Sequence, residues 1–287
     1  LLFHRCIQYK ERRERKRMKT IFSGFITGAV MTVPGVSGGS AAMILGIYDD
    51  LVRALSQCLR EPRRNICLLL QFSLGGAAGI LLTARLITWL LSTPAEVPLR
   101  FLFLGAVAGG VPMIFRKAYI RRLSAGCIAL VLCGISAVLL ISSLPQGLFS
   151  PGRSGQTAVT LQFAGGIILA AALVFPGISA SHMLVLLGIY DDVMQMVCGF
   201  DLVGLVPLLF GGAIGLFLTA RLLDHLIERH QSGTYMVILG FMLASLRELL
   251  PQGVSLVQVL TGVPCVLAGF VPVYLAQSAP PKSKKEL

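Results

Sequence analysis

Charged residues are scarce in this sequence. They make up only 13% of its 287 residues, whereas hydrophobic residues make up 55%. A soluble globular domain carries about 25% charged residues, so the shortage argues against a soluble protein. Because long apolar stretches cross a bilayer as helices, we predict an all-α integral membrane protein.

The sequence also lacks a cysteine pattern typical of disulfides or of a metal site. The seven cysteines are scattered along the chain, with neither paired spacing nor the spacing of metal ligands. Cysteines of this kind in membrane helices are usually small apolar packing residues. We therefore expect no metal and no cofactor.

Acidic residues are outnumbered 13 to 25 by basic ones, which gives a formal net charge of +12. The excess does not indicate a nucleic-acid partner, because the basic residues lie in segments that flank apolar stretches. Eight of them fall in residues 5–19, four in 53–64 and four in 116–122. This distribution follows the positive-inside rule and suits contact with anionic lipid headgroups.

Long apolar runs predict six membrane-spanning helices, since about 20 apolar residues cross a hydrocarbon core. They lie at 66–92, 100–115, 123–143, 204–227, 234–248 and 255–276. Two further regions, 21–57 and 158–197, each contain two short apolar arms around a Pro-Gly turn. We interpret each as a re-entrant helical hairpin, because irregular backbone at that depth must be buried in protein or line a cavity. Two full crossings per hairpin would fit the loop charges equally well, and the short arms favour re-entry.

The loop charges predict the orientation. Loop 93–99 carries no Lys or Arg and loop 144–157 carries only Arg153, whereas 116–122 is basic. Both termini are therefore placed in the cytoplasm, with the first hairpin opening inward and the second outward. The expected segments are a basic cytoplasmic stretch, two membrane repeats and a cytoplasmic tail, at 1–19, 20–157, 158–276 and 277–287.

One motif occurs twice. Residues 34–50 (PGVSGGSAAMILGIYDD) and 176–192 (PGISASHMLVLLGIYDD) are identical at 9 of 17 positions. LGGAAGILLTARL at 74–86 likewise returns as FGGAIGLFLTARL at 210–222. Each half holds one hairpin and three spans, and an odd number of spans inverts the second half relative to the first. Inverted-topology repeats are typical of transporters with a site at the repeat interface.

Paired glycines predict close contacts between helices. The small-xxx-small pattern occurs at Gly24/Gly28, Gly75/Gly79, Gly105/Gly109 and Gly211/Gly215. Such faces let helix backbones approach each other in membranes.

Arg85 and Arg221 are the charged residues that recur inside the predicted spans, each within LTARL. A charge at this depth is costly and by default indicates function. The planar guanidinium suits two phosphate oxygens at once, so both are candidates for binding an anionic headgroup. The alternative is that each side chain snorkels to the interface.

The hairpin turns are candidate anion sites. Ser37, Gly38, Gly39 and Ser40 open the outgoing arm of the first hairpin, and Ser179, Ser181 and His182 that of the second. The free N–H groups at a helix start attract anions. The alternative is that Gly and Ser only permit a tight buried turn. His182, which aligns with Ser40, either donates to phosphate or tunes proton coupling, or is a hydrogen-bonded turn residue.

Two acidic pairs close the outgoing arms in this interpretation. They are Asp49-Asp50 and Asp191-Asp192, each after a tyrosine. One Asp of each pair is a candidate for coupling or gating. The alternative is an interfacial tyrosine anchor followed by solvated carboxylates.

The doubled PGxS…LGIYDD blocks and the LTARL helices resemble the polyprenyl-phosphate transporter family (PopT type) over about residues 20–276. The resemblance implies a flippase of the bacterial plasma membrane that returns undecaprenyl phosphate from the outer to the inner leaflet. The recovered lipid carrier would then serve cell-envelope synthesis, and the protein would not be an enzyme.

Three other functions remain open on the residues alone. A transporter or channel for a small soluble anion could use the same site. A lipid phosphatase would need a nucleophile with an acid–base partner, and the trio Ser179, Ser181 and His182 lacks a carboxylate nearby in the sequence. A scaffold subunit would need neither inverted hairpins nor paired arginines.

Overall fold

A computed structural model describes residues 2–33, 36–120, 124–147, 156–199, 201–250 and 256–278. These residues form twelve helices and no strand. The helices are α1 (Leu2–Met31), α2 (Gly38–Ile44), α3 (Tyr48–Ser56), α4 (Pro62–Leu91), α5 (Glu96–Lys117), α6 (Ala125–Ser142), α7 (Gln156–Val174), α8 (Ala180–Leu187), α9 (Tyr190–Cys198), α10 (Leu202–Arg229), α11 (Gln231–Leu249) and α12 (Leu256–Ser278). The first Pro-Gly pair and most of the expected cytoplasmic tail lie outside the described residues.

Local sequence explains several helix starts. Pro62 occupies the first turn of α4, where its missing N–H is no loss. The Ser124 side chain accepts a hydrogen bond from the Cys127 N–H and caps α6. The Asp201 side chain accepts one from the Gly204 N–H and caps α10. Each cap satisfies a donor that a helix start would otherwise leave unpaired.

Five of the six predicted spans are confirmed as helices long and apolar enough to cross a membrane: α4, α5, α6, α10 and residues 258–277 of α12. The sixth, 234–248, forms α11 but is not among these helices. Its side chains make the core instead, since Tyr235, Met236, Ile238, Leu239 and Met242 are at most 2% exposed. Protein surrounds α11, so it needs no continuous apolar surface toward lipid.

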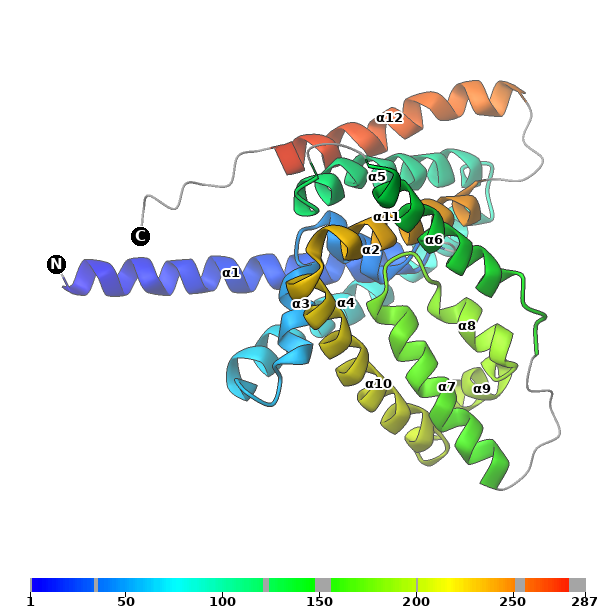
Figure 1. Ribbon diagram of the computed structural model, residues 1–287, viewed down its shortest axis with the longest axis horizontal. Coiled ribbons are helices and arrows are strands. Elements are labelled where there is room, and N and C mark those ends of the chain that lie inside the picture. Colours follow the sequence, from blue (N-terminus) through cyan, green and yellow to red (C-terminus); the bar gives the residue numbers. More distant parts are fainter. Residues whose placement is uncertain are drawn as a thin grey trace.

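The helices pack mainly in four pairs. Helix α1 packs on α4 and α7 on α10, whereas α5 packs on α12 and α6 on α11 (Figure 1). In the sequence repeat, α1–α6 correspond to α7–α12. Each of the first two pairs therefore lies within one half. Each of the other two pairs joins a helix of the first half, α5 or α6, to a helix of the second half, α12 or α11. The same pairing in both halves agrees with the duplication of the sequence.

Glycines form the contacts within these pairs, as predicted. A Cβ added at Gly28 would collide with the Gly76 carbonyl, and one added at Gly79 with the Phe25 carbonyl. A Cβ added at Gly211 would likewise collide with the Phe163 carbonyl on α7, and one added at Gly105 with the Val266 carbonyl on α12. The expected small-residue packing is thus confirmed, and helix backbones touch without intervening side chains.

The hairpin regions each consist of a long helix, a turn and two short helices. With 7 residues in α2 and 8 in α8, these arms rise only about 10–12 Å at 1.5 Å per residue, far less than the roughly 30 Å of a bilayer core.

One local expectation was wrong. The YDD motifs were expected to close the outgoing arms, but Gly46 (φ 70°) and Gly188 (φ 74°) end those arms first. Tyr48 and Tyr190 begin new helices, and the Asp pairs lie in their first turns. The physical reason is that glycine readily adopts the left-handed backbone that terminates a helix, while carboxylates are favourable at the next helix start.

The close approach of α1 and α4 gives a matched test. Replacing Gly79 with Ala should lower the free energy of unfolding by about 1–3 kcal/mol, because the new methyl group overpacks the Phe25 carbonyl. Gly76→Ala on the same helix should be tolerated, since its Cβ would lie 3.6 Å from the Gly24 carbonyl oxygen. Thermal unfolding of both variants in detergent measures the difference, and equal destabilisation would contradict the packing argument.

Candidate functional site

The two hairpin turns meet near the centre of the bundle. A Cβ added to Gly39 would lie 3.1 Å from the Pro176 Cα, so α2 contacts the second turn directly. Gly177, with φ 87°, packs against the backbone of Phe241 in α11. The first turn therefore packs on the second, and the second packs on the buried helix α11, in a region built from glycine, proline and small side chains.

The first turn is closed by packing. Ser37 and Ser40 are 7% and 1% exposed, and Gly38 faces the Met31 sulfur. Ser37 is the N-cap of α2, and its carbonyl accepts the Ala41 N–H at 3.0 Å. The Ser40 Oγ is buried and has no hydrogen-bond partner among the described residues. Both serine side chains of this turn are therefore buried in this conformation.

The second turn lines a small pocket. Ser179, His182 and Gly177 form one side of it, and Ser142 at the end of α6 contributes another polar group. The Ser179 side chain accepts the His182 N–H at 3.4 Å and caps α8. His182 Nε2 is buried without a hydrogen-bond partner in the described chain. Ser181 is exposed and does not line this pocket. Val138, Ile141, Ile178 and Met183 form the apolar remainder of the lining. Its polar groups are hydroxyls, an imidazole and a helix start, which suit an anionic oxygen.

Arg85 and Arg221 lie on exposed surfaces of α4 and α10. The Arg221 guanidinium carbon lies 6.0 Å from the centre of the Phe217 ring, one turn earlier on the same helix. The buried glycines of α4 and α10 face α1 and α7 instead. Among the described residues, no hydrogen bond or ion pair joins either arginine to a hairpin turn. Their role in phosphate binding stays a prediction, as does the alternative of snorkelling.

Helix α3 is attached to the rest of the bundle at its N-terminal end. Lys117 Nζ donates to Asp49 Oδ2 at 2.6 Å, and the Tyr235 hydroxyl donates to Asp49 Oδ1 at 2.8 Å. The Tyr48 hydroxyl donates to the Val174 carbonyl at 2.8 Å. These bonds connect α3 to α5, α11 and α7, which belong to both halves.

The C-terminal end of α3 is attached to α10. The Ser56 hydroxyl donates to Asp224 Oδ2 at 2.7 Å, and Asp224 is 7% exposed. We call the four contacts of Tyr48, Asp49 and Ser56 the α3 anchor. It spans the distance between the two ends of a nine-residue helix.

The other acidic residues of the repeated motif have no such attachment among the described contacts. Asp50, Asp191 and Asp192 are exposed, and none of them takes part in the ion pairs found among the described residues. The main contacts of α9 are with α8 and α10 of its own half, whereas α3 packs extensively on α10 of the opposite half. The two copies of the motif are therefore not equivalent in this structure.

Sequence reasoning missed Lys117, Tyr235 and Asp224. Asp224 did leave a signal, because it is an acidic residue inside the predicted span 204–227 and three residues after Arg221. Lys117 and Tyr235 left none, since only the packing of α3 against α5 and α11 brings them to Asp49.

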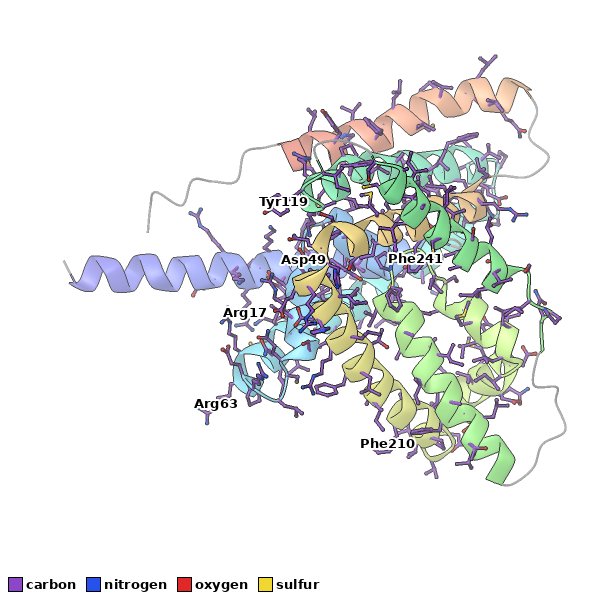
Figure 2. The ribbon with its side chains drawn as sticks, in the orientation of Figure 1. Arg17, Asp49, Arg63, Tyr119, Phe210 and Phe241 are labelled. Carbon is purple, nitrogen blue, oxygen red and sulfur yellow. The ribbon has the colours of Figure 1, made fainter. Side chains whose placement is uncertain are left out.

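Segments expected on the cytoplasmic side lie next to one another. The Ser232 hydroxyl donates to the Ala118 carbonyl at 2.6 Å, and Arg116 donates to the Gln277 carbonyl at 2.9 Å. Figure 2 shows Asp49 and Tyr119 on the side from which the basic part of α1 projects, with Phe210 at the far end of α10. These segments therefore lie at one end of the bundle, and the orientation of that end in the membrane stays a prediction.

The chain matches the undecaprenyl phosphate translocase-like family over residues 26–261. A polyprenyl-phosphate transporter of Vibrio cholerae serotype O1 is 31% identical over 248 residues, covering 82% of this chain and 78% of the relative. A polyprenyl-phosphate transporter of Staphylococcus aureus is 27% identical over 242 residues, covering 80% and 85%. No solved structure matches the chain. The family match includes both copies of the repeated motif and both LTARL helices.

The unequal motifs give a paired test of the α3 anchor. Asp49→Ala should lower the free energy of unfolding by about 1–2 kcal/mol relative to Asp191→Ala, because only Asp49 bonds to Lys117 and Tyr235. Both substitutions remove a carboxylate from the first turn of a short helix, so the helix-dipole contribution cancels. Chemical denaturation of the two variants is the measurement. If they are equally stable, the anchor contributes nothing.

Proposed function

Because the chain belongs to the undecaprenyl phosphate translocase-like family, we propose that it moves undecaprenyl phosphate from the outer to the inner leaflet of the bacterial plasma membrane. The returned carrier is then available for envelope synthesis. The observation that supports this best is the pocket at the second turn, with the unpaired His182 Nε2 beside the start of α8.

In this conformation the pocket is small, with a volume of about 10 Å³, and in our proposal its polar groups bind a phosphate oxygen once the turn opens. Ser142, Ser179 and His182 supply donors, and the N–H groups at the start of α8 add positive potential. Among the described residues, the pocket lining contains no Asp or Glu. A carboxylate there would repel the headgroup, and a phosphatase would use one to orient a histidine. The transporter names of both relatives also favour transport over hydrolysis.

The isoprenoid tail needs no enclosed site. Helices α4, α10 and α12 expose large apolar side chains, among them Leu81, Leu209 and Leu260, so the tail stays in lipid while the headgroup crosses. Arg85 and Arg221 stand on these exposed surfaces. In our proposal they receive the phosphate from the bilayer and pass it to the turns.

Alternating access follows from the inverted repeats in this proposal. Each hairpin enters and leaves by one face, the first by the cytoplasmic face and the second by the outer face, with both termini in the cytoplasm. The closed turn at Ser37–Ser40 and the pocket at Ser179–His182 then represent one of two conformations. The turns exchange roles when the hairpins move, and Asp49, Asp50, Asp191 and Asp192 serve as gating residues.

Leaflet exchange of a fluorescent undecaprenyl phosphate in proteoliposomes tests the function. Wild-type protein should accelerate exchange, and Arg85→Ala and Arg221→Ala should each slow it by about 10–100-fold, as expected for a lost charge-assisted hydrogen bond of about 1.5–3 kcal/mol. Arg63→Ala, at the exposed start of α4, is the control and should leave the rate unchanged. If the protein does not accelerate lipid exchange but does carry inorganic phosphate into the liposomes, it is a transporter of a soluble anion.

The second turn is tested by a separate pair of variants. His182→Ala should weaken binding of undecaprenyl phosphate at least tenfold, because it removes from the pocket the imidazole whose Nε2 is buried and unpaired among the described residues. Ser40→Ala changes the aligned position in the closed turn and should leave the affinity of this conformation unchanged. Binding titrations in detergent compare the two, and equal losses would show that the headgroup occupies both turns together.

A further inference from the structure

The contacts between helices repeat from one half of the bundle to the other. A Cβ added at Gly105 in α5 would meet the Val266 carbonyl in α12, and one added at Gly240 in α11 would meet the Val131 carbonyl in α6. Gly240 follows Gly105 by as many positions as Val266 follows Val131. Residues of α5 and α6 therefore have structural equivalents in α11 and α12, just as the repeated motif gives α3 its equivalent in α9.

The Tyr48 contact of the α3 anchor has an equivalent in the second copy of the motif. Tyr48 donates to the carbonyl of Val174, two residues before the second Pro-Gly turn. The aligned tyrosine is Tyr190, and the residue two positions before the first Pro-Gly turn is Thr32. Among the hydrogen bonds of the described residues, none joins Tyr190 to the Thr32 carbonyl. Tyr190 instead packs in the apolar cluster that contains Ile189.

The Asp49 contact has an equivalent between two residues of opposite charge. Asp49 accepts a hydrogen bond from Tyr235 in α11, and the glycine alignment makes Arg100 in α5 the equivalent of Tyr235. The carboxylate equivalent to Asp49 is Asp191, which is exposed in this structure. Arg100 Nε here donates to Glu96 Oε1 at 2.9 Å on its own helix. An arginine and a carboxylate that meet form a charge-assisted hydrogen bond, so the equivalent contact is chemically favourable.

Arg100 and helix α9 lie at the same end of the bundle. Helix α4 begins beside the end of α3, where Asn65 donates to the Gln57 carbonyl at 2.8 Å, and α10 ends beside α3 at Asp224. Helices α4 and α10 therefore run in opposite directions. The start of α5, which follows α4 in the chain, thus lies at the end where α10 begins and where α9 packs against the first turn of α10. In Figure 1, α3 lies at the end from which α1 projects, and α9 lies at the other end.

We propose that the protein adopts a second conformation in which the α3 anchor is released and the equivalent contacts form on α9. In that conformation Asp191 binds Arg100, and the Tyr190 hydroxyl donates to the Thr32 carbonyl. Helix α9 is then docked on the first half, as α3 is docked on the second half in this structure. The two conformations differ in which end of the bundle is closed by a helix that joins both halves. The role of this exchange in transport rests on the proposed function, but the exchange of contacts does not.

Cross-linking of the full-length protein in liposomes measures how often the second conformation forms. Asp191→Cys combined with Arg100→Cys should react with a short bifunctional thiol reagent, and mass spectrometry of the linked peptides identifies this pair among the native cysteines. Asp191→Cys combined with Leu99→Cys is the matched control. Leu99 is equivalent to Thr234, whose hydroxyl bonds to carbonyls at the end of α10 rather than to α3, so the control pair should react more slowly.

Weakening the α3 anchor should favour the second conformation, because a state gains population when its competitor loses contacts. Asp49→Ala added to the Asp191→Cys and Arg100→Cys pair should raise the initial rate of cross-linking about 5–30-fold, the factor expected for the free energy that the Asp49 contacts contribute. Glu61→Ala is the control and should leave the rate unchanged. It removes an exposed carboxylate that bonds to Arg64 and takes no part in the α3 anchor.

Two results would overturn the proposal. One is an Asp191→Cys and Arg100→Cys pair that reacts no faster than the Leu99→Cys control. The other is a cross-linking rate that Asp49→Ala does not raise. If the double-cysteine variant does not fold, Tyr190→Cys combined with Thr32→Cys probes the other equivalent contact, and its rate should respond to the loss of the Asp49 carboxylate in the same way.

The lipid-exchange assay separates this inference from the proposed function. Asp191→Arg and Arg100→Asp should each slow exchange of fluorescent undecaprenyl phosphate several-fold, and the combined variant should recover most of the wild-type rate, because the ion pair forms again with its charges exchanged. If wild-type protein exchanges no lipid but Asp49→Ala still speeds cross-linking, the function is wrong and the second conformation stands. If lipid is exchanged and the combined variant is no faster than the single variants, the function stands and the contact between Asp191 and Arg100 has no part in transport.

Discussion

Direct contact between helix backbones at glycine positions is the constraint on which the rest of this structure depends. Inside a bilayer, apolar side chains gain little by leaving lipid for protein, so helices associate through close packing. Here each of the four main helix pairs contains glycines whose Cβ would strike a carbonyl of the partner, including Gly79, Gly105, Gly134 and Gly211. Because these pairs hold the long helices close together, the hairpin turns and the short helices α2 and α8 that follow them are confined to the centre of the bundle.

Confinement explains why the hairpin turns are built from small residues. Gly39 contacts the backbone at Pro176, and Gly177 contacts α11. A larger side chain at Gly39 would separate the two turns, and one at Gly177 would separate the second turn from α11. The same scarcity of side-chain atoms leaves backbone N–H groups and short hydroxyls near the pocket at Ser179 and His182, so packing and the proposed anion binding use the same residues.

The repeated motif is used differently in the two halves. The first copy is tied to both halves by Tyr48 and Asp49, and α3 continues onto α10 through Ser56. The second copy has exposed carboxylates, and α9 stays with its own half. In the proposed alternating access, the two copies of the motif would exchange these contacts as each half takes both roles in turn.

The sequence by itself determined the helical membrane class, the duplication, five of the apolar spans and the glycine faces. Each of these depends on local composition or on residues a few positions apart, which periodicity and hydropathy record. Only the tertiary structure decided that α5 and α6 exchange partners between halves, that α11 is the core, and that Lys117 and Tyr235 meet Asp49. The burial of Asp224 beside Ser56 belongs to the same group. Such contacts join residues more than sixty positions apart, and their energy depends on which helix faces meet, which no local pattern in one sequence specifies.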